Sequence, residues 1–249
     1  MITLPILSDY QQSLLSDIYD STLLAIPHYK YYPEMLPFVG SHYQRLNKKI
    51  LVIGESHYWD ADSDAHFDVD AWYNGEARQH MTKINADYIF TRGVVSQGHH
   101  RHYGFKAAAI FQRVEAALAD CLQLPRNYPT DNYFRYAAFY NYFQRPAGHK
   151  VSLAAKENDR KVAFSHLLEL ISILQPTHLA FVSKLAYRTF LQELSNAEKA
   201  SVGTHYFGCP HPGSSWWNRK QRFRDASQQV HRMKGREWFQ HNIGPLELI

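Results

Sequence analysis

Residues 51–59 read LVIGESHYW, an apolar run that stops on a glycine and passes directly into residues capable of chemistry. The capable residues are Glu55, Ser56, His57, Tyr58 and Trp59. A carboxylate or an imidazole can orient or deprotonate water, and a hydroxyl can act with the help of a neighbouring base. Because a short β-favouring run bounded by glycine is typical of a buried strand, we predict a strand over 49–54 that presents these side chains at its end.

Polar residues also follow three later segments that are predicted to be strands, at 134–143, 176–183 and 202–208. Asn141 lies near the end of the first, Ser183 and Lys184 follow the second, and CPHPGSSWWN, with His211, follows the third. The carboxyl ends of parallel strands meet at one edge of a sheet, where ligands bind in α/β proteins. We therefore expect these strand ends to form one candidate active site.

Each of these residues also has an ordinary structural interpretation. Glu55 could be a partner of a helix N-terminus, and His211, between two prolines, could stiffen a loop by bonding a backbone carbonyl. Asn141, in an otherwise apolar strand, needs partners for its amide. It would either brace a loop or read the donor and acceptor edge of a ligand such as a nucleobase.

The elements that would position these residues alternate along the chain. Apolar residues at helical spacing predict helices at 8–25, 105–122, 157–174, 184–195 and 218–233, with a further helix near 75–91. Strands that alternate with helices favour an α/β fold with three α/β/α layers around a central four-stranded, mainly parallel sheet. Without repeats or low-complexity linkers, 1–249 is predicted to be one domain, with an N-terminal helical or irregular extension at 1–48 and a polar insert at 60–104.

Composition narrows the class of protein. The 249 residues are 45% hydrophobic and 20% charged, which supports a packed core and argues against global disorder. No apolar run is long enough to span a membrane, and the N-terminus lacks a signal pattern, so we expect no membrane contact. Two cysteines fit a reducing cytoplasm better than secretion, and we expect a cytoplasmic monomer. Cys121 and Cys209 are too few for an iron–sulfur cluster or a four-cysteine zinc site.

Positive charge is concentrated near the C-terminus. Between Asn218 and Arg236 the only acid is Asp225. The basic residues of this stretch are Arg219, Lys220, Arg222, Arg224, Arg232, Lys234 and Arg236. Such an excess would either bind a polyanion or form a solvated helix face.

Four segments together resemble the uracil-DNA glycosylase superfamily. They are GESHY (54–58), AFYNYFQRP (138–146), QPTHLAFVSKLAYRTF (175–190) and CPHPGSS (209–215). They occur in the family's order and span residues 50–218, although Ser56 and His57 stand where aspartate or asparagine and then proline are common, and the cluster cysteines of the iron–sulfur branches are absent.

The resemblance implies a cofactor-free hydrolase that cleaves the N-glycosidic bond of a flipped uracil or another modified or deaminated base in DNA. The catalytic groups it implies are Glu55, Ser56, His57 and His211. Glu55 or Ser56, the latter helped by His57, would orient water, and His211 would stabilise the departing base.

By the same resemblance Asn141 would read the base and Tyr58 would restrict its pocket, with Gly54, Trp59 and Ser183 completing the substrate-binding set. The DNA-binding residues would be Lys184, Ser214, Ser215, Trp216, Arg219, Lys220 and Arg222. Trp216 or Trp217 would serve as the wedge that fills the gap left by the flipped base.

Three other interpretations remain open at this stage. The alternating aspartates of DADSDAHFDVD (60–70) do not complete a calcium loop, but His57, Asp60 and His66 could form a metal-dependent hydrolase with His99, His100 and His102. The chain could also be a non-catalytic nucleic-acid-binding protein of the same fold, or a hydrolase of a small N-glycoside.

Overall fold

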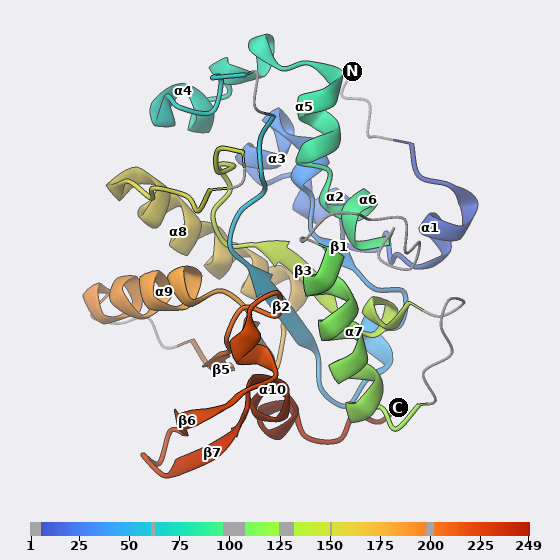
Figure 1. Ribbon diagram of the computed structural model, residues 1–249. Coiled ribbons are helices and arrows are strands. Elements are labelled where there is room, and N and C mark those ends of the chain that lie inside the picture. The colour runs from blue at the N-terminus through green and yellow to red at the C-terminus, as the bar shows by residue number, and fades with distance from the viewer. Residues whose placement is uncertain (1–5, 61–62, 97–107, 125–131, 150, 198–201) are drawn as a thin grey trace.

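The computed structural model describes residues 6–60, 63–96, 108–124, 132–149, 151–197 and 202–249. Within these residues a five-stranded sheet has the order β1-β3-β2-β4-β5, with β2 at its centre (Figure 1). The strands are β1 (Phe38–Val39), β2 (Ile50–Gly54), β3 (Ala138–Asn141), β4 (His178–Phe181) and β5 (His205–Gly208). The predicted α/β class is confirmed, and each of the four predicted strand segments contains a strand, although the segment at 134–143 begins in a 3-10 turn (Tyr133–Tyr136). The pairs β2–β3, β2–β4 and β4–β5 are all parallel. The short β1 adds a fifth strand, antiparallel to β3.

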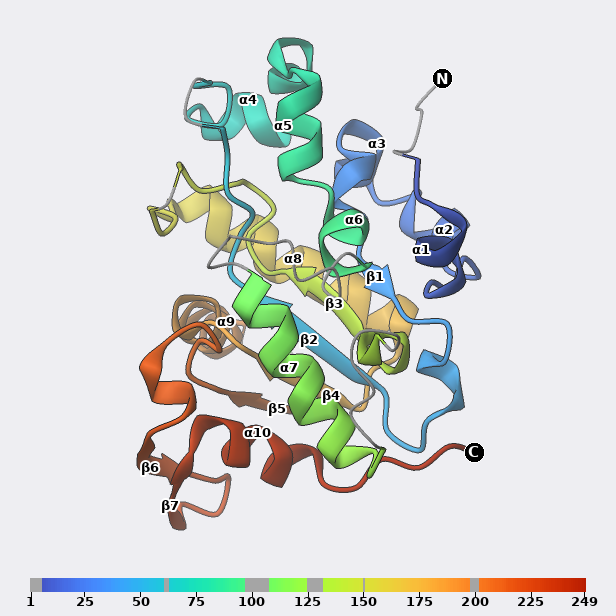
Figure 2. The same cartoon turned by 45° about the vertical axis from the view of Figure 1, so that its right-hand side comes forward.

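The two faces of the sheet bury two separate hydrophobic clusters, as the alternation of side chains along a strand requires. In β2, Leu51 and Ile53 belong to one cluster, and Ile50 and Val52 belong to the other. The first cluster is covered by α8 (Glu157–Leu174), α9 (Lys184–Asn196) and α3 (Pro27–Tyr31), and the second by α7 (Ala108–Cys121) and α10 (Gly235–Ile243). Figure 2 shows α7 in front of the sheet and α8 behind it, an arrangement of three layers.

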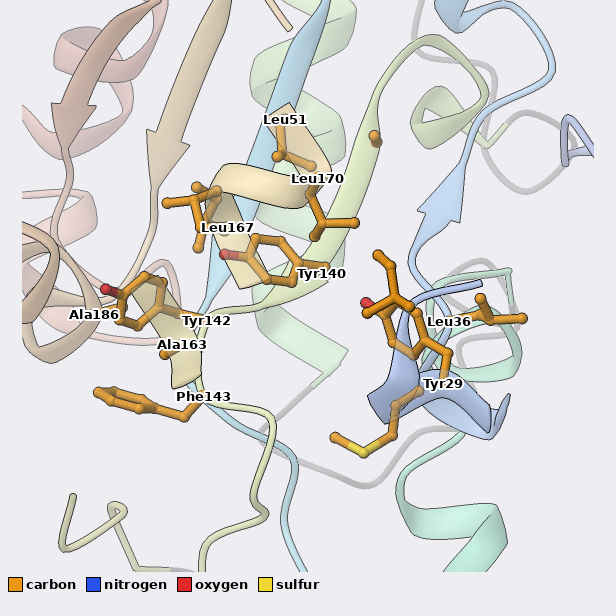
Figure 3. Packing of buried hydrophobic residues seen from close by; sticks show 14 of the residues in the cluster. Tyr29, Leu36, Leu51, Tyr140, Tyr142, Phe143, Ala163, Leu167, Leu170 and Ala186 are labelled. Atoms are coloured by element: carbon orange, nitrogen blue, oxygen red, sulfur yellow. The ribbon is translucent and has the colours of Figure 1, made fainter. Parts of the chain in front are cut away.

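The long helices follow the predicted periodicity closely. α8 has the predicted bounds, and Leu167 and Leu170 lie in the first cluster with Tyr140 of β3 (Figure 3). α9 ends one residue later than predicted and α7 ends one residue earlier, at Cys121. The predicted residues 105–107 lie outside the described residues. These helices were predictable because each has one apolar face that a sheet covers.

The N-terminal helix prediction for 8–25 is wrong. The structure has two short helices, α1 (Asp9–Ser13) and α2 (Asp20–Leu23). Between them Leu15 pairs with Gly40, and the Ser16 amide donates to the Val39 carbonyl over 2.8 Å. The chain thus leaves the helix to bond the edge of the sheet.

The insert is more helical than predicted. It contains α4 (Val69–Tyr73), a 3-10 turn (Glu76–His80), α5 (Lys83–Tyr88) and α6 (Thr91–Ser96), in place of one helix near 75–91. No helix of the described ranges is long and apolar enough to cross a membrane.

The prediction of a helix at 218–233 is also wrong. Strands β6 (Lys220–Arg224) and β7 (Val230–Lys234) form an antiparallel hairpin there, and α10 follows it. The residues of β6 and β7 alternate between exposed and half-buried, and this repeat of two residues is typical of a strand. Phe223 and Met233 alternate with charged residues, and their inward face packs on Trp238 of α10, to which Phe223 stacks with ring centroids 4.9 Å apart.

Two buried histidines, His28 and His166, should make the stability of the fold depend on pH. The rings of His28 and His166 are buried with centroids 5.8 Å apart. Burial lowers the pKa of His166 to about 3 and that of His28 well below its ordinary value. In the unfolded chain histidine takes up its proton near pH 6.5, so below that pH the unfolded chain binds more protons than the folded one.

We therefore expect the free energy of unfolding to be highest above pH 6.5 and to fall as the pH decreases toward 3. His166 alone should account for about 2–3 kcal/mol between pH 7 and pH 4.5. Urea unfolding at several pH values measures this, and His166→Phe should flatten the profile. His80→Gln, a change at an exposed ring, should leave the profile unchanged. A profile that His166→Phe does not alter would contradict the prediction.

Candidate active site at the strand ends

The site is built where backbone pairing continues past the ends of the strands. The Phe143 amide donates to the Glu55 carbonyl over 2.9 Å, and the Ala147 amide donates to the His57 carbonyl over 2.8 Å. On the other side of β2, the Val182 amide donates to the Ile53 carbonyl over 2.9 Å. The segments that follow β2, β3 and β4 are therefore held side by side, as the sequence predicts.

A buried serine orients the Glu55 carboxylate. Ser183 is 1% exposed and accepts a hydrogen bond from the Ala186 amide over 3.2 Å at the start of α9. The Ser183 hydroxyl donates to Oε2 of Glu55 over 2.7 Å. Glu55 is half-buried, and its Oε1 has no hydrogen-bond partner among the described residues. The carboxylate thus has a fixed direction and one oxygen free to accept a bond from water.

Asn141 lies against Gly54, its partner across the β2–β3 ladder. A Cβ at position 54 would be 2.3 Å from Oδ1 of Asn141, so only glycine permits this approach. The Asn141 side chain is 8% exposed and makes no hydrogen bond to any residue that the structure describes. A nearly buried amide with its donors and acceptor unused is suited to reading the edge of a ligand.

His211 occupies the loop after β5. The Gly213 amide donates to Nδ1 of His211 over 3.1 Å, which places the proton of the neutral ring on Nε2. The pKa of His211 is lowered, first by partial desolvation and then by the nearby Arg113 cation, while Glu55 acts in the opposite direction. A neutral ring with an Nε2–H donor is therefore the favoured form near pH 7.

Two residues near the site carry no sequence motif. Arg113 of α7 donates from its guanidinium to the Pro212 carbonyl, and this contact places a cation beside the His211 loop. The Tyr187 ring of α9 lies over Gly208 at the end of β5, where a Cβ would be 2.3 Å from the ring. Both residues lie within helices, where sequence spacing indicates only which face is apolar.

Tyr58 lies on the segment that follows β2. It is 43% exposed and bridges to Ala147. Burial, and then the charge of Glu55, raise the pKa of its hydroxyl, which locates the ring near that carboxylate. Ser56 is half-buried next to Glu55.

Trp59 and His57 point away from the site. Trp59 is fully buried and packs edge-on against Trp72 with centroids 5.4 Å apart, so its prediction as a substrate-binding residue is corrected to a core residue. Nε2 of His57 lies 3.0 Å from the hydroxyl oxygen of Thr91 in α6. Burial lowers the pKa of His57 to about 4. That placement directs the ring to the insert and does not support help for Ser56.

The predicted DNA contacts lie mostly on one segment. Ser214 donates its hydroxyl to the His211 carbonyl over 2.7 Å, and Trp216 is 53% exposed. Trp217 is buried, which leaves Trp216 as the only candidate wedge of the pair. The remaining predicted contacts are exposed at the start of α9, after β5 and on β6: Lys184, Ser215, Arg219, Lys220 and Arg222.

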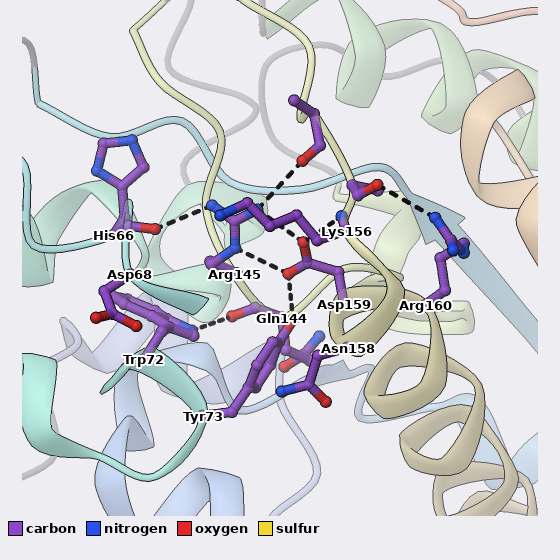
Figure 4. Close-up of polar contacts among 12 residues, drawn as sticks. His66, Asp68, Trp72, Tyr73, Gln144, Arg145, Lys156, Asn158, Asp159 and Arg160 are labelled. Atoms are coloured by element: carbon purple, nitrogen blue, oxygen red, sulfur yellow. Dashed lines mark hydrogen bonds and ion pairs between the residues drawn. The ribbon is translucent and has the colours of Figure 1, made fainter. Parts of the chain in front are cut away.

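A buried ion pair braces the loop that follows Asn141 (Figure 4). Arg145 donates from Nε and Nη2 to the two carboxylate oxygens of Asp159 in α8, over 2.8 and 2.7 Å. Its Nη1 donates to the His66 carbonyl in the insert over 2.9 Å. The insert, the loop after β3 and the start of α8 are thus locked together behind the site.

The metal-site alternative finds no support in the part of the chain that the structure describes. There, no three His, Cys, Asp or Glu groups are close enough to hold an ion. His66 is buried and packs in a tilted arrangement against Phe67, with ring centroids 4.3 Å apart. His99, His100 and His102 lie outside the described residues.

Two open hollows in the surface lie elsewhere. One is bordered by Asp120 and His241 between α7 and α10, and the other by Asp70 and Lys156. Neither contains a residue of the strand-end set.

Comparison with known proteins adds no family to this geometry. No protein-family model matches the chain, and no curated protein gives a significant match. Arguments about function therefore depend on the site itself.

Replacing Gly54 tests the contact with Asn141. In Gly54→Ala the new methyl must displace the Asn141 amide or strain β2, so we expect a loss of about 1–3 kcal/mol in the free energy of unfolding. Gly203→Ala is the matched control, because nothing lies within 4 Å of a Cβ at that position. Urea unfolding of both variants measures the difference, and equal stabilities would contradict the described packing.

The electrostatic neighbours of His211 can be tested without any substrate. Its ring should titrate below pH 6.5 in an NMR titration. Arg113→Met removes a charge that lowers the His211 pKa and should raise the midpoint, whereas Glu55→Gln should lower it further. Arg113→Lys keeps the charge and should change the midpoint least. Shifts of the same sign in Arg113→Met and Glu55→Gln would contradict the arrangement.

Proposed function

We propose that this chain is a DNA-glycosylase-like hydrolase that cleaves the N-glycosidic bond of a flipped uracil or another deaminated or modified base. One observation carries the proposal. An oriented carboxylate, an unused amide and a neutral imidazole donor follow the carboxyl ends of β2, β3 and β5, on Glu55, Asn141 and His211, and Glu55 lies near enough to His211 to act on its pKa.

The chemistry of glycosidic cleavage explains why these three groups suit the reaction. As the bond to the base breaks, positive charge develops on the sugar and negative charge on the base. The Glu55 carboxylate would stabilise the sugar cation and accept a hydrogen bond from the attacking water, with Ser183 fixing its direction. The Nε2–H of His211 would donate to the base oxygen on which negative charge collects, and a neutral donor serves without adding a proton to the base.

Asn141 supplies recognition in this proposal. An amide offers one acceptor and two donor hydrogens in one plane, which match the alternating carbonyl and N–H groups on the edge of a uracil ring. The close approach to Gly54 fixes that plane. Tyr58, exposed beside Glu55, would limit the width of the space for the base.

The surroundings of His211 favour DNA over a free small N-glycoside. The segment that carries His211 continues directly into the exposed Trp216 and the exposed cations Arg219 and Lys220. A free nucleoside would need none of these residues, whereas a polynucleotide strand would contact them through its phosphates.

A panel of oligonucleotides tests the proposal. Single- and double-stranded substrates with uracil, hypoxanthine, xanthine, mismatched thymine or a modified cytosine are incubated with the protein, and alkaline cleavage detects abasic sites. We expect cleavage with at least one base, reduced about 10²–10³-fold in Asn141→Ala and His211→Ala.

His80→Gln is the control for these variants and should leave cleavage unchanged, since its exposed ring lies in the insert. Absence of cleavage with every substrate by a folded protein would contradict the proposal. Salt-sensitive binding without cleavage would instead favour a non-catalytic nucleic-acid-binding protein, and weak, salt-insensitive binding would favour a small-molecule hydrolase.

A further inference from the structure

The hairpin of β6 and β7 exposes one face that consists almost entirely of cations. Its exposed residues form three cross-strand pairs, Lys220 with Lys234, Arg222 with Arg232, and Arg224 with Val230. Like charges opposite each other in a sheet repel, so this arrangement is unfavourable in the free protein. A bound polyanion would remove the repulsion.

These cations have few protein partners. Lys220, Arg222 and Arg232 make no ion pair with any residue of the described ranges. Lys234 forms a long ion pair, with its Nζ 3.8 Å from Oε1 of Glu237. The one acid of the hairpin, Asp225 in its turn, bonds to His231 over 2.8 Å, and its pKa is lowered to about 2, first by that hydrogen bond. Its carboxylate is thus engaged with His231, and among the described residues it makes no ion pair with the lysines and arginines of the outer face.

The inner face of the hairpin holds it in a fixed relation to the candidate active site. Phe223 stacks on Trp238, and the Trp238 indole donates to the Gly208 carbonyl over 3.1 Å. Gly208 ends β5, three residues before His211. A partner bound on the outer face is thus positioned relative to that loop, while the hairpin itself lies at the periphery of the molecule (Figure 1).

We propose that the β6–β7 hairpin is a phosphate-binding arm that grips double-stranded DNA beside the nucleotide held at the site. The choice of a duplex follows from the residues of the face. Its aromatic residues, Phe223 and His231, point inward, so it offers no ring on which unpaired bases could stack. A two-stranded ribbon fits the major groove of B-DNA, about 12 Å wide, whereas the major groove of double-stranded RNA is too narrow.

This inference rests on the proposed function and extends the predicted contacts at Lys220 and Arg222 to a face formed by both strands of the hairpin. Its test is independent of base removal. Binding of an undamaged DNA duplex is measured by fluorescence anisotropy over a range of salt concentrations. In Arg222→Gln/Arg232→Gln the slope of log K against log salt should become less steep by about 1.8, since each lost phosphate contact contributes about 0.9.

Two matched variants complete the experiment. Arg45→Gln/Arg188→Gln removes the same charge from exposed sites outside the hairpin and should keep the wild-type slope. Arg222→Lys/Arg232→Lys retains the charge and should also keep it, which separates loss of charge from misfolding. Circular dichroism checks that all variants are folded.

Several results would overturn the inference: no salt-dependent binding of the duplex, an unchanged slope in the glutamine variant, or an equal change in the Arg45 and Arg188 control. Equal affinity for a single strand or an RNA duplex of the same length would overturn the choice of duplex DNA. If the slopes are as expected but no base is removed, the proposed function alone is refuted. If bases are removed but the expected slopes are not seen, only the arm is refuted.

Discussion

The central position of β2, paired in parallel with β3 on one side and β4 on the other, is the constraint on which the rest of the structure depends. Both pairings continue beyond the strands as backbone hydrogen bonds from Phe143 and Val182. Three segments that lie far apart in the sequence are thereby fixed side by side, and each contributes one polar group: Glu55, Asn141 or Ser183. A change that weakens this pairing would disperse the site before it altered any of its chemistry.

A buried ion pair, Arg145 with Asp159, holds the loop after β3 in place. The Arg145–Asp159 pair is buried, and removing two charges from water costs several kcal/mol per ion, against which act the bidentate geometry and the further hydrogen bonds to both groups. Loss of either partner alone would leave the other charge buried without its counter-ion. The pair joins the loop after Asn141 to α8 and to the insert.

Sequence periodicity predicted the elements that bury one clear face, such as α8 and the four parallel strands, and therefore also predicted that Glu55, Asn141, Ser183 and His211 follow strand ends. Periodicity gave a wrong prediction at 218–233, where most residues of the two strands are charged or polar. In β6 and β7 the apolar residues are few, and only their alternation separates a hairpin from a basic helix. It also failed for Trp59 and His57, because beyond the end of a strand nothing in the local pattern shows which way a side chain turns. The role of Arg113 depends on how α7 crosses the sheet, which is a tertiary property.

The central claim is that water held by Glu55 attacks the sugar carbon while His211 supports the departing base. Quantifying by mass spectrometry the free base released from an oligonucleotide with a deaminated base tests this most directly. Wild-type protein should release the base, and Glu55→Gln and His211→Ala should each release it about 10²–10³-fold more slowly. Release of no base by the wild type, or release at the wild-type rate by both variants, would contradict the claim.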